Sequence, residues 1–294
     1  MKRLLGLALG SGSARGWAHI GVINGLASHG IVPDVVSGCS IGAFVAAALA
    51  NGDLERLEKW AAALKWTDVL GLVDVGFGSG LIKGEKLMAF FEQHFKDRSI
   101  DQLPMPFSCV ATELATGREI WLREGSVAAA VRASIALPGL FNPVLRDGRV
   151  LVDGGLVNPV PVSLCHALGA EVVIGVDLGA DLVGNGVHNE PAAPTRDDDE
   201  SDWVHRLGHS LGFRNGEAIR EDEIPGVASV LATSIHIMQT RIARSRLSGE
   251  PADLILAPRL ASLGLMDFHR AAVAIAEGRA EVERMLPAIE NVLA

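Results

Sequence analysis

Tyrosine is absent from the 294-residue sequence, and aromatic residues together make up only 5% of it. This excludes dehydrogenases that rely on a tyrosine as their acid. Basic residues are also in the minority, with 26 lysines and arginines against 35 aspartates and glutamates and a net charge of -9. Because no dense basic stripe with interleaved aromatic residues is present, the sequence predicts no nucleic-acid partner.

Cysteine is equally scarce. Cys39, Cys109 and Cys165 lie far apart in the chain and mostly within apolar runs. Such spacing builds neither a disulfide framework nor a C-x-x-C metal site, and it favours a reducing compartment. No other metal-binding pattern is visible. We therefore expect a cytoplasmic protein with no metal and no cofactor.

Long hydrophobic runs are lacking as well. No uninterrupted apolar stretch reaches the roughly 20 residues that a membrane-spanning helix needs. The first residues, MKRLLGLALG, imitate a signal peptide, but the apolar run is short, leads directly into GSGSARG and lacks a small-x-small cleavage site. We interpret this segment as a first β-strand. We expect a soluble protein, with transient contact at a membrane surface left open.

The sequence does have enough apolar residues for a large core, since 49% of its residues are hydrophobic and 21% are charged. Strand-like and helix-like patterns alternate, which predicts an α/β fold with a mostly parallel sheet between helices. We expect helices over 16–30, 42–51, 227–247 and 267–294. Strands are expected over 4–10, 32–38, 107–114, 118–122, 149–154, 171–178 and 252–258.

The pattern predicts one domain over 1–294 with two departures from regular alternation. Residues 53–104 read as a mostly helical excursion. Residues 181–225 are polar and read as a flexible surface insertion, in which 203–213 could form a short amphipathic helix. Apolar residues among glycines over 70–82 fit either a mobile lid or a loop folded over the core.

A serine between two glycines follows the second expected strand, in the stretch GCSIG. In a strand-turn-helix nucleophile elbow the serine hydroxyl is exposed at the edge of the sheet, and flanking side chains would clash with backbone. Gly38 and Gly42 occupy those flanking places around Ser40. The helix that follows adds free N–H groups and a positive dipole end. The competing interpretation is a serine that merely caps a helix.

The glycine-rich loop GSGSARG follows the first expected strand. Such a loop can turn successive backbone N–H groups toward one anion, and Gly12 and Ser13 are the expected donors. Arg15 could either brace the loop or contact the substrate, and we favour the bracing role. The same loop resembles a dinucleotide fingerprint, but Asp34, its candidate ribose-binding acid, opens the second strand instead of ending it.

A base is needed to activate the serine. Asp153 ends an expected strand in RVLVDGG, and active sites of parallel sheets gather at strand ends. A turn aspartate is the plainer alternative. Histidines that follow the serine are poorly placed in the pattern, and the best of them, His269, opens the last helix. The others considered are His166, His188, His205, His209 and His236.

Taken together, LGSGSARG, GCSIG and VDGG resemble the motifs of bacterial patatin-like phospholipases, and ATELATG and LIKGEKL extend the similarity over nearly the whole chain. The resemblance implies a three-layer α/β/α sandwich that hydrolyses esters of lipids through a serine–aspartate dyad and an acyl-enzyme. It places the nucleophile at Ser40 and the base at Asp153. The remaining implied site residues are the oxyanion donors Gly12 and Ser13, the supporting Gly10, Ser11, Arg15 and Gly16, the elbow glycines Gly38 and Gly42, and the turn glycines Gly154 and Gly155.

One departure from the family pattern is that Ser11 and Ser13 stand where glycine is usual. Backbone N–H donors survive this change unless the loop needs a positive φ, at which serine costs more than glycine. A non-catalytic binding module, with 181–225 docking a partner, is the alternative from another class.

Overall fold

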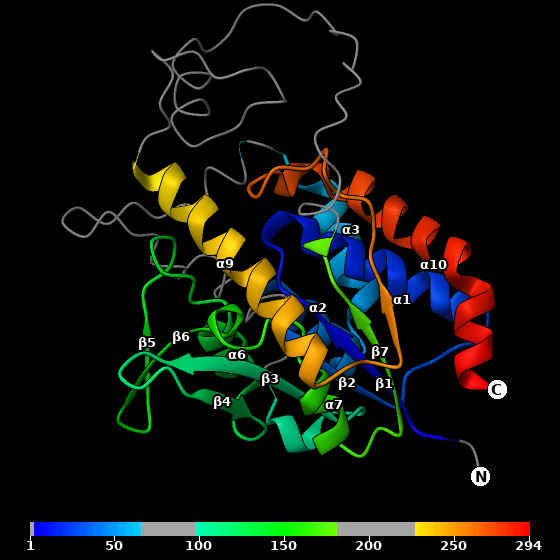
Figure 1. The fold of residues 1–294 in the computed structure, drawn as a ribbon, viewed down its shortest axis with the longest axis horizontal. Helices are drawn as coiled ribbons and strands as arrows, with labels where there is room; N and C mark the ends of the chain where they lie inside the picture. Colours follow the sequence, from blue (N-terminus) through cyan, green and yellow to red (C-terminus); the bar gives the residue numbers. More distant parts are fainter. Residues whose placement is uncertain (1–2, 66, 68–97, 181–226) are drawn as a thin grey trace, which may run out of the picture.

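The computed structural model describes residues 3–65, 67, 98–180 and 227–294 (Figure 1). The predictions for 70–82, for 181–225 with 203–213, and for most of 53–104 concern residues outside this part of the chain. The described elements are β1 (Leu5–Leu9), η1 (Ser13–Trp17), α1 (Ala18–Ser28), β2 (Val35–Cys39), α2 (Ile41–Asn51), α3 (Leu54–Ala63), η2 (Ile100–Gln102), β3 (Phe107–Glu113), β4 (Glu119–Leu122), α6 (Val127–Ser134), β5 (Val144–Arg146), β6 (Arg149–Asp153), η3 (Gly154–Leu156), α7 (Val162–Ala167), β7 (Val172–Val176), α9 (Val227–Gly249), β8 (Leu254–Leu256), η5 (Phe268–Arg270) and α10 (Ala271–Leu293).

The described strands form an eight-stranded mixed sheet in the order β5-β6-β3-β2-β1-β7-β8, with β4 paired to β3 outside this path. The pairs β1–β2, β1–β7, β2–β3 and β7–β8 are parallel, whereas β3–β4, β3–β6 and β5–β6 are antiparallel. All seven strands expected from the sequence are present. The three-residue strand β5 and the short helices α6 and α7 were not predicted.

Helices cover both faces of the sheet, and alternation along β1 shows which side chains meet them (Figure 1). Leu5, Leu7 and Leu9 face the larger core together with side chains of α1, α2, α3, α6 and α10. Ala8 faces the opposite side, where it packs with side chains of α7 and α9. Central strands buried on both faces read as continuous apolar runs, which is why LLGLALG imitated a signal peptide.

Within residues 3–65, 98–180 and 227–294, no helix combines the length and apolar character needed to cross a bilayer.

Candidate active site

Ser40 occupies the turn between β2 and α2 in a strained backbone conformation, with φ 55° and ψ -125°. A non-glycine residue at positive φ costs free energy, and such strain gathers at functional sites. The elbow is also too tight for side chains next to it. A Cβ on Gly38 would lie 2.5 Å from the Ala43 nitrogen, and a Cβ on Gly42 would meet the carbonyl oxygens of Leu9 and Gly10.

The Ser40 hydroxyl donates a hydrogen bond to Asp153, with 2.6 Å between Oγ and Oδ2. The strand register explains this contact. One edge of β3 pairs with β4 from Cys109 to Thr112, so β2 and β6 share the other edge. There β2 pairs as far as Val110 and β6 begins at Ala111, with the two strands pointing at each other. Their C-terminal ends therefore meet. Ser40 directly follows the last residue of β2, and Asp153 is the last residue of β6.

This register corrects the sequence-based reason for choosing Asp153. The aspartate was expected at the carboxyl end of a strand belonging to a parallel sheet. Instead β6 runs antiparallel to β3, its neighbour. The residue lies next to Ser40 because the antiparallel strand is short and stops where β2 stops.

The Asp153 side chain is fully buried. Its Oδ1 atom accepts a hydrogen bond from the Gly155 nitrogen at 2.7 Å, and its own carbonyl oxygen accepts one from Thr112 Oγ1 at 2.8 Å. Burial raises the pKa of Asp153 from 3.8 to about 6, although the hydrogen bonds from Ser40 and Gly155 lower it in part. The carboxylate is thus a stronger base than an exposed aspartate, and it is still ionised at neutral pH.

Gly154 lets the chain cross directly over β3 after the aspartate. A Cβ on Gly154 would meet the carbonyl oxygen of Val110, and one on Gly155 would lie 2.9 Å from Asp153 Oδ1. Both predicted turn glycines therefore stand where the backbone approaches the site closely.

The glycine-rich loop between β1 and α1 leaves two backbone donors unused. Gly10 N donates to Val176 O at 3.0 Å, Ser11 N to Pro159 O at 2.9 Å, and Ala14 N to Leu265 O at 3.1 Å. Among the described residues, the intervening Gly12 and Ser13 nitrogens have no such acceptor. Ser13 adopts φ 54°, so the loop does require a positive φ at a position where the related motif usually has glycine.

Arg15 is buried and links the glycine-rich loop to two segments that are distant in the sequence. Its Nε donates to Leu263 O at 2.8 Å, and its Nη1 lies 3.0 Å from His236 Nε2. Burial lowers the pKa of His236 to about 4, so the imidazole is neutral and accepts this hydrogen bond. A Cβ on Gly16 would overlap the side chain of Ile41 at the start of α2, which shows how closely loop and elbow pack.

None of the described histidines is hydrogen-bonded to the Ser40 hydroxyl, whose partner is Asp153. His166 Nδ1 pairs with Ala170 O at 3.1 Å, His236 faces Arg15, and His269 lies in η5. His188, His205 and His209 are outside the described residues. The acid of the dinucleotide alternative, Asp34, accepts a hydrogen bond from Leu5 N at 2.9 Å, at the N-terminal end of β2, whereas the elbow follows the C-terminal end of that strand.

Comparison with known proteins identifies the family. The patatin-like phospholipase family model matches residues 7–166, which include both Ser40 and Asp153. The chain belongs to the patatin-like phospholipase family. This is a family of lipid carboxylic ester hydrolases, so the family, the enzyme class and the fold class expected from the sequence are confirmed.

Individual proteins similar to this chain support the same family assignment. An uncharacterized NTE family protein of Mycobacterium tuberculosis is 32% identical, with 97% of this chain and 91% of the relative aligned. Patatin-like phospholipase domain-containing protein 7 of Mus musculus is 32% identical over 60% of this chain and 14% of its own length. The crystal structure of VipD from Legionella pneumophila shares the fold, with a TM-score of 0.55 at 14% identity, over 98% of this chain and 67% of VipD.

One hydrogen bond of the candidate site was not predicted from the sequence. The Ser40 nitrogen donates to the hydroxyl of Ser134 at 2.9 Å, and Ser134 is fully buried at the end of α6. No local pattern marks RASIALPG as a partner of the elbow, since the two segments lie 94 positions apart. This hydrogen bond satisfies the backbone of the strained serine from outside its own turn.

Among the described residues, no group of three or more His, Cys, Asp or Glu side chains is arranged to hold a metal ion. The three cysteines are free and buried.

Proposed function

We propose that this chain is a serine esterase that cleaves carboxylic esters of lipids through a Ser40–Asp153 dyad and an acyl-enzyme. The observation that carries the proposal is the 2.6 Å hydrogen bond from a positive-φ serine at a helix N-terminus to a fully buried carboxylate. A serine that only capped the helix would direct its hydroxyl to a backbone N–H of α2. No such side-chain cap is present on α2.

In the first step the Ser40 oxygen attacks the ester carbonyl carbon while its proton passes to Asp153. The carbonyl oxygen becomes negative and accepts hydrogen bonds from the unused N–H groups of Gly12 and Ser13. The N-terminus of the eleven-residue helix α2 adds a positive dipole end beside the same charge. Collapse of the tetrahedral species breaks the bond to the alcohol, which leaves with the proton held by Asp153.

In the second step water attacks the acyl carbon of the ester now attached to Ser40. Asp153 takes a proton from this water and then returns it to the departing serine oxygen. The acid is released and the dyad returns to its starting state. No other proton carrier is needed, which fits the absence of a hydrogen bond between the serine hydroxyl and any described histidine.

The acidic limb of the pH profile is expected near pH 6. Asp153 must be ionised to accept the proton, and burial raises its pKa to about 6. Below that pH, kcat/KM should therefore fall about tenfold for each pH unit, and above it the curve should level off. The measurement is kcat/KM for a short soluble ester between about pH 4 and pH 9.

Tryptophan fluorescence over the same range is the control for acid unfolding. A limb near pH 4, where an exposed aspartate titrates, would contradict a buried base. A fall in kcat/KM that follows the loss of the tryptophan fluorescence of the folded protein would contradict it as well.

The nucleophile itself is tested by covalent labelling. Incubation with a fluorophosphonate probe, followed by intact mass and peptide mapping, should show one adduct, on the peptide that carries Ser40. Ser40→Ala should show none. The matched control is Ser108→Ala, because Ser108 is a buried serine of β3 whose hydroxyl has no hydrogen-bond partner among the described residues.

The control variant should be labelled as fast as the wild type. An adduct that persists in Ser40→Ala, or one that maps to another residue, would refute the assignment. A wild-type protein that stays unlabelled and turns over no ester would favour the binding-module alternative.

The substrate proposed is a lipid ester, with phospholipids suggested by the family description, reached by transient contact with a membrane surface. A cytoplasmic location is proposed because Cys39, Cys109 and Cys165 are all unpaired and buried. We further propose that residues 1–294 form a single hydrolase domain, since strands from Leu5 to Leu256 join the same sheet.

A further inference from the structure

The segment 154–161, which we call the Asp153 loop, joins the carboxylate to the glycine-rich loop. At its start, the Gly155 nitrogen donates to Asp153 Oδ1 at 2.7 Å. Further along, the carbonyl oxygen of Pro159 accepts a hydrogen bond from the Ser11 nitrogen at 2.9 Å, directly before the two unused donors. Any shift of this loop therefore moves the proposed base and the proposed oxyanion donors relative to each other.

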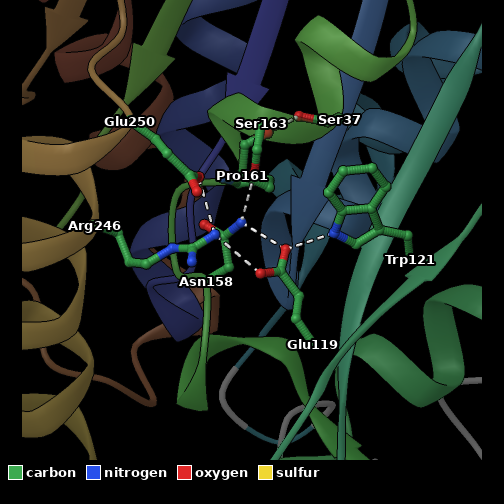
Figure 2. A network of polar contacts seen from close by, with 8 residues as sticks. All are labelled: Ser37, Glu119, Trp121, Asn158, Pro161, Ser163, Arg246 and Glu250. Carbon is green, nitrogen blue, oxygen red and sulfur yellow. Dashed lines mark hydrogen bonds and ion pairs between the residues drawn. The ribbon is translucent and has the colours of Figure 1, made fainter.

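Asn158 anchors the centre of the Asp153 loop and is almost completely buried. Its backbone nitrogen donates to Gly154 O at 2.9 Å. Its side-chain Nδ2 donates to Glu119 Oε1 at 2.8 Å and to Ser163 Oγ at 3.1 Å (Figure 2). Both N–H groups of the amide are thus used, so the side chain has one well-defined orientation.

Glu119 opens β4 and accepts hydrogen bonds from its own strand and from two distant parts of the chain. Figure 2 shows Asn158, Trp121 and Arg246 all directed at its carboxylate. Trp121 Nε1 donates to Oε1 at 2.7 Å, and Arg246 Nη2 on α9 lies 2.9 Å from Oε2. Arg246 is held in turn by Glu250 at 2.9 Å.

A partly buried carboxylate with charge-assisted and neutral donors is a rigid fixed point. The side chain of Glu119 is only 18% exposed, so solvent competes weakly for its oxygens. It sits on the edge of β3 opposite Asp153, because β4 takes one edge and β6 the other. The Asp153 loop is thus hydrogen-bonded to Asp153 at its start and, through Asn158, to Glu119 near its centre.

We propose that Glu119 is a positioning residue for the reaction, acting through Asn158 on the Asp153 loop. It touches neither the dyad nor the unused donors, and it fixes the distance between them. This inference rests on the proposed function for its kinetic consequence, whereas its structural consequence can be measured without turnover.

The kinetic test is Glu119→Gln. The amide keeps the shape but offers one acceptor oxygen for three donors, so it opposes an N–H group either to Asn158 or to Arg246. We expect kcat for a short soluble ester to fall roughly tenfold to a hundredfold, because small misplacements of reacting groups are costly. KM should stay within about twofold, since no substrate contact is removed.

The matched control is Glu113→Gln at the end of β3, on the same hairpin. Its carboxylate meets Thr116 and Arg149 and has no contact with Asn158. This variant should keep kcat within about twofold of the wild type. If both variants lose kcat equally, or if Glu119→Gln loses none, the proposal is wrong.

A double-mutant cycle with Asn158→Ala tests the route of the effect. If Glu119 acts through Asn158, the double variant should be no slower than the slower single variant. Losses that multiply would show two independent effects and would overturn the route proposed here.

Hydrogen exchange gives the readout that needs no activity. In Glu119→Gln the amides of Ser11 and Gly155 should exchange faster, while the Gly10 amide, bonded to Val176 O, should be unchanged. Unchanged exchange at Ser11 and Gly155 would overturn the proposal. If the wild type hydrolyses no ester and is not labelled, the proposed function fails, and the exchange data still decide whether Glu119 holds the loop.

Should Glu119→Gln fail to fold, Glu119→Asp replaces it. Aspartate keeps the negative charge, but its side chain is one methylene shorter, so its carboxylate lies farther from Asn158. The same loss of kcat and the same faster exchange are expected, and normal values for both would contradict the proposal.

Discussion

Asp153→Asn is expected to lower kcat for ester hydrolysis by roughly 10³-fold or more, the scale seen when one member of a catalytic constellation is removed. Asparagine fills the same space and keeps an acceptor for Ser40 or for Gly155. It has no basic oxygen that can take the serine proton. The loss should therefore appear in kcat and in the rate of fluorophosphonate labelling, with little change in KM.

The same substitution is expected to stabilise the fold at pH 8. The pKa of Asp153 is about 6 in the folded protein against 3.8 for an ordinary aspartate, so its ionised form is penalised on folding. This penalty, on the order of 2 to 3 kcal/mol, is present above pH 6 and fades as the pH falls toward 4. Asparagine carries no charge and avoids it.

Denaturant unfolding at pH 8 and at pH 4 measures this difference, with Asp34→Asn as the matched control. Asp34 lies at the N-terminal end of β2, the end away from Ser40, where it accepts a hydrogen bond from Leu5 N. That variant should keep kcat within about twofold. An Asp153→Asn protein that retains its kcat would refute the dyad, and one whose stability relative to the wild type is the same at pH 8 as at pH 4 would refute the burial of the charge.

Gly42→Ala is expected to have the second largest effect, on both stability and reactivity. Its added Cβ would lie 2.6 Å from the Gly10 carbonyl oxygen, 2.7 Å from the Leu9 carbonyl carbon and closer still to the Leu9 oxygen. All three are backbone atoms of the central strand and the loop after it, so none can rotate away. We expect a loss of about 2 to 3 kcal/mol in the free energy of unfolding.

The clash would also move the N-terminus of α2, and Ser40 with it, away from the glycine-rich loop. Labelling of Ser40 by a fluorophosphonate should slow by roughly a hundredfold in the protein that is still folded. Gly249→Ala is the matched control, because a Cβ there meets no atom within 4 Å. If Gly42→Ala matched this control in both unfolding and labelling, the close contact of elbow and loop would be wrong.

Most of the fold was predictable because its strands carry a clear local signal. The buried runs at Leu5–Leu9 and Val172–Val176 are apolar on both faces, and each expected strand is present. The failures are short or mixed segments. The strand Val144–Arg146 has a partly exposed three-residue pattern, and the helix Val162–Ala167 is only six residues long, so neither carries a readable period.

The residues of the candidate site likewise fall into those that the sequence predicted and those that it did not. Ser40, Asp153 and the glycines around them were found from motifs, because a tight turn and a close backbone approach permit few residue types. Ser134, Asn158 and Glu119 were not found. Each is linked by a side-chain hydrogen bond to a segment distant in the sequence, and a single serine, asparagine or glutamate leaves no local pattern.

The sequence by itself determined the alternation of strands and helices, the family and the chemical groups of the candidate site, because these follow from local pattern and from residue type. Only the tertiary structure decided that β2 and β6 share one edge of β3 and end against each other. That register brings the serine to 2.6 Å from the carboxylate. The burial that raises the pKa of Asp153 is likewise a product of packing, since it depends on side chains from segments that no sequence window contains.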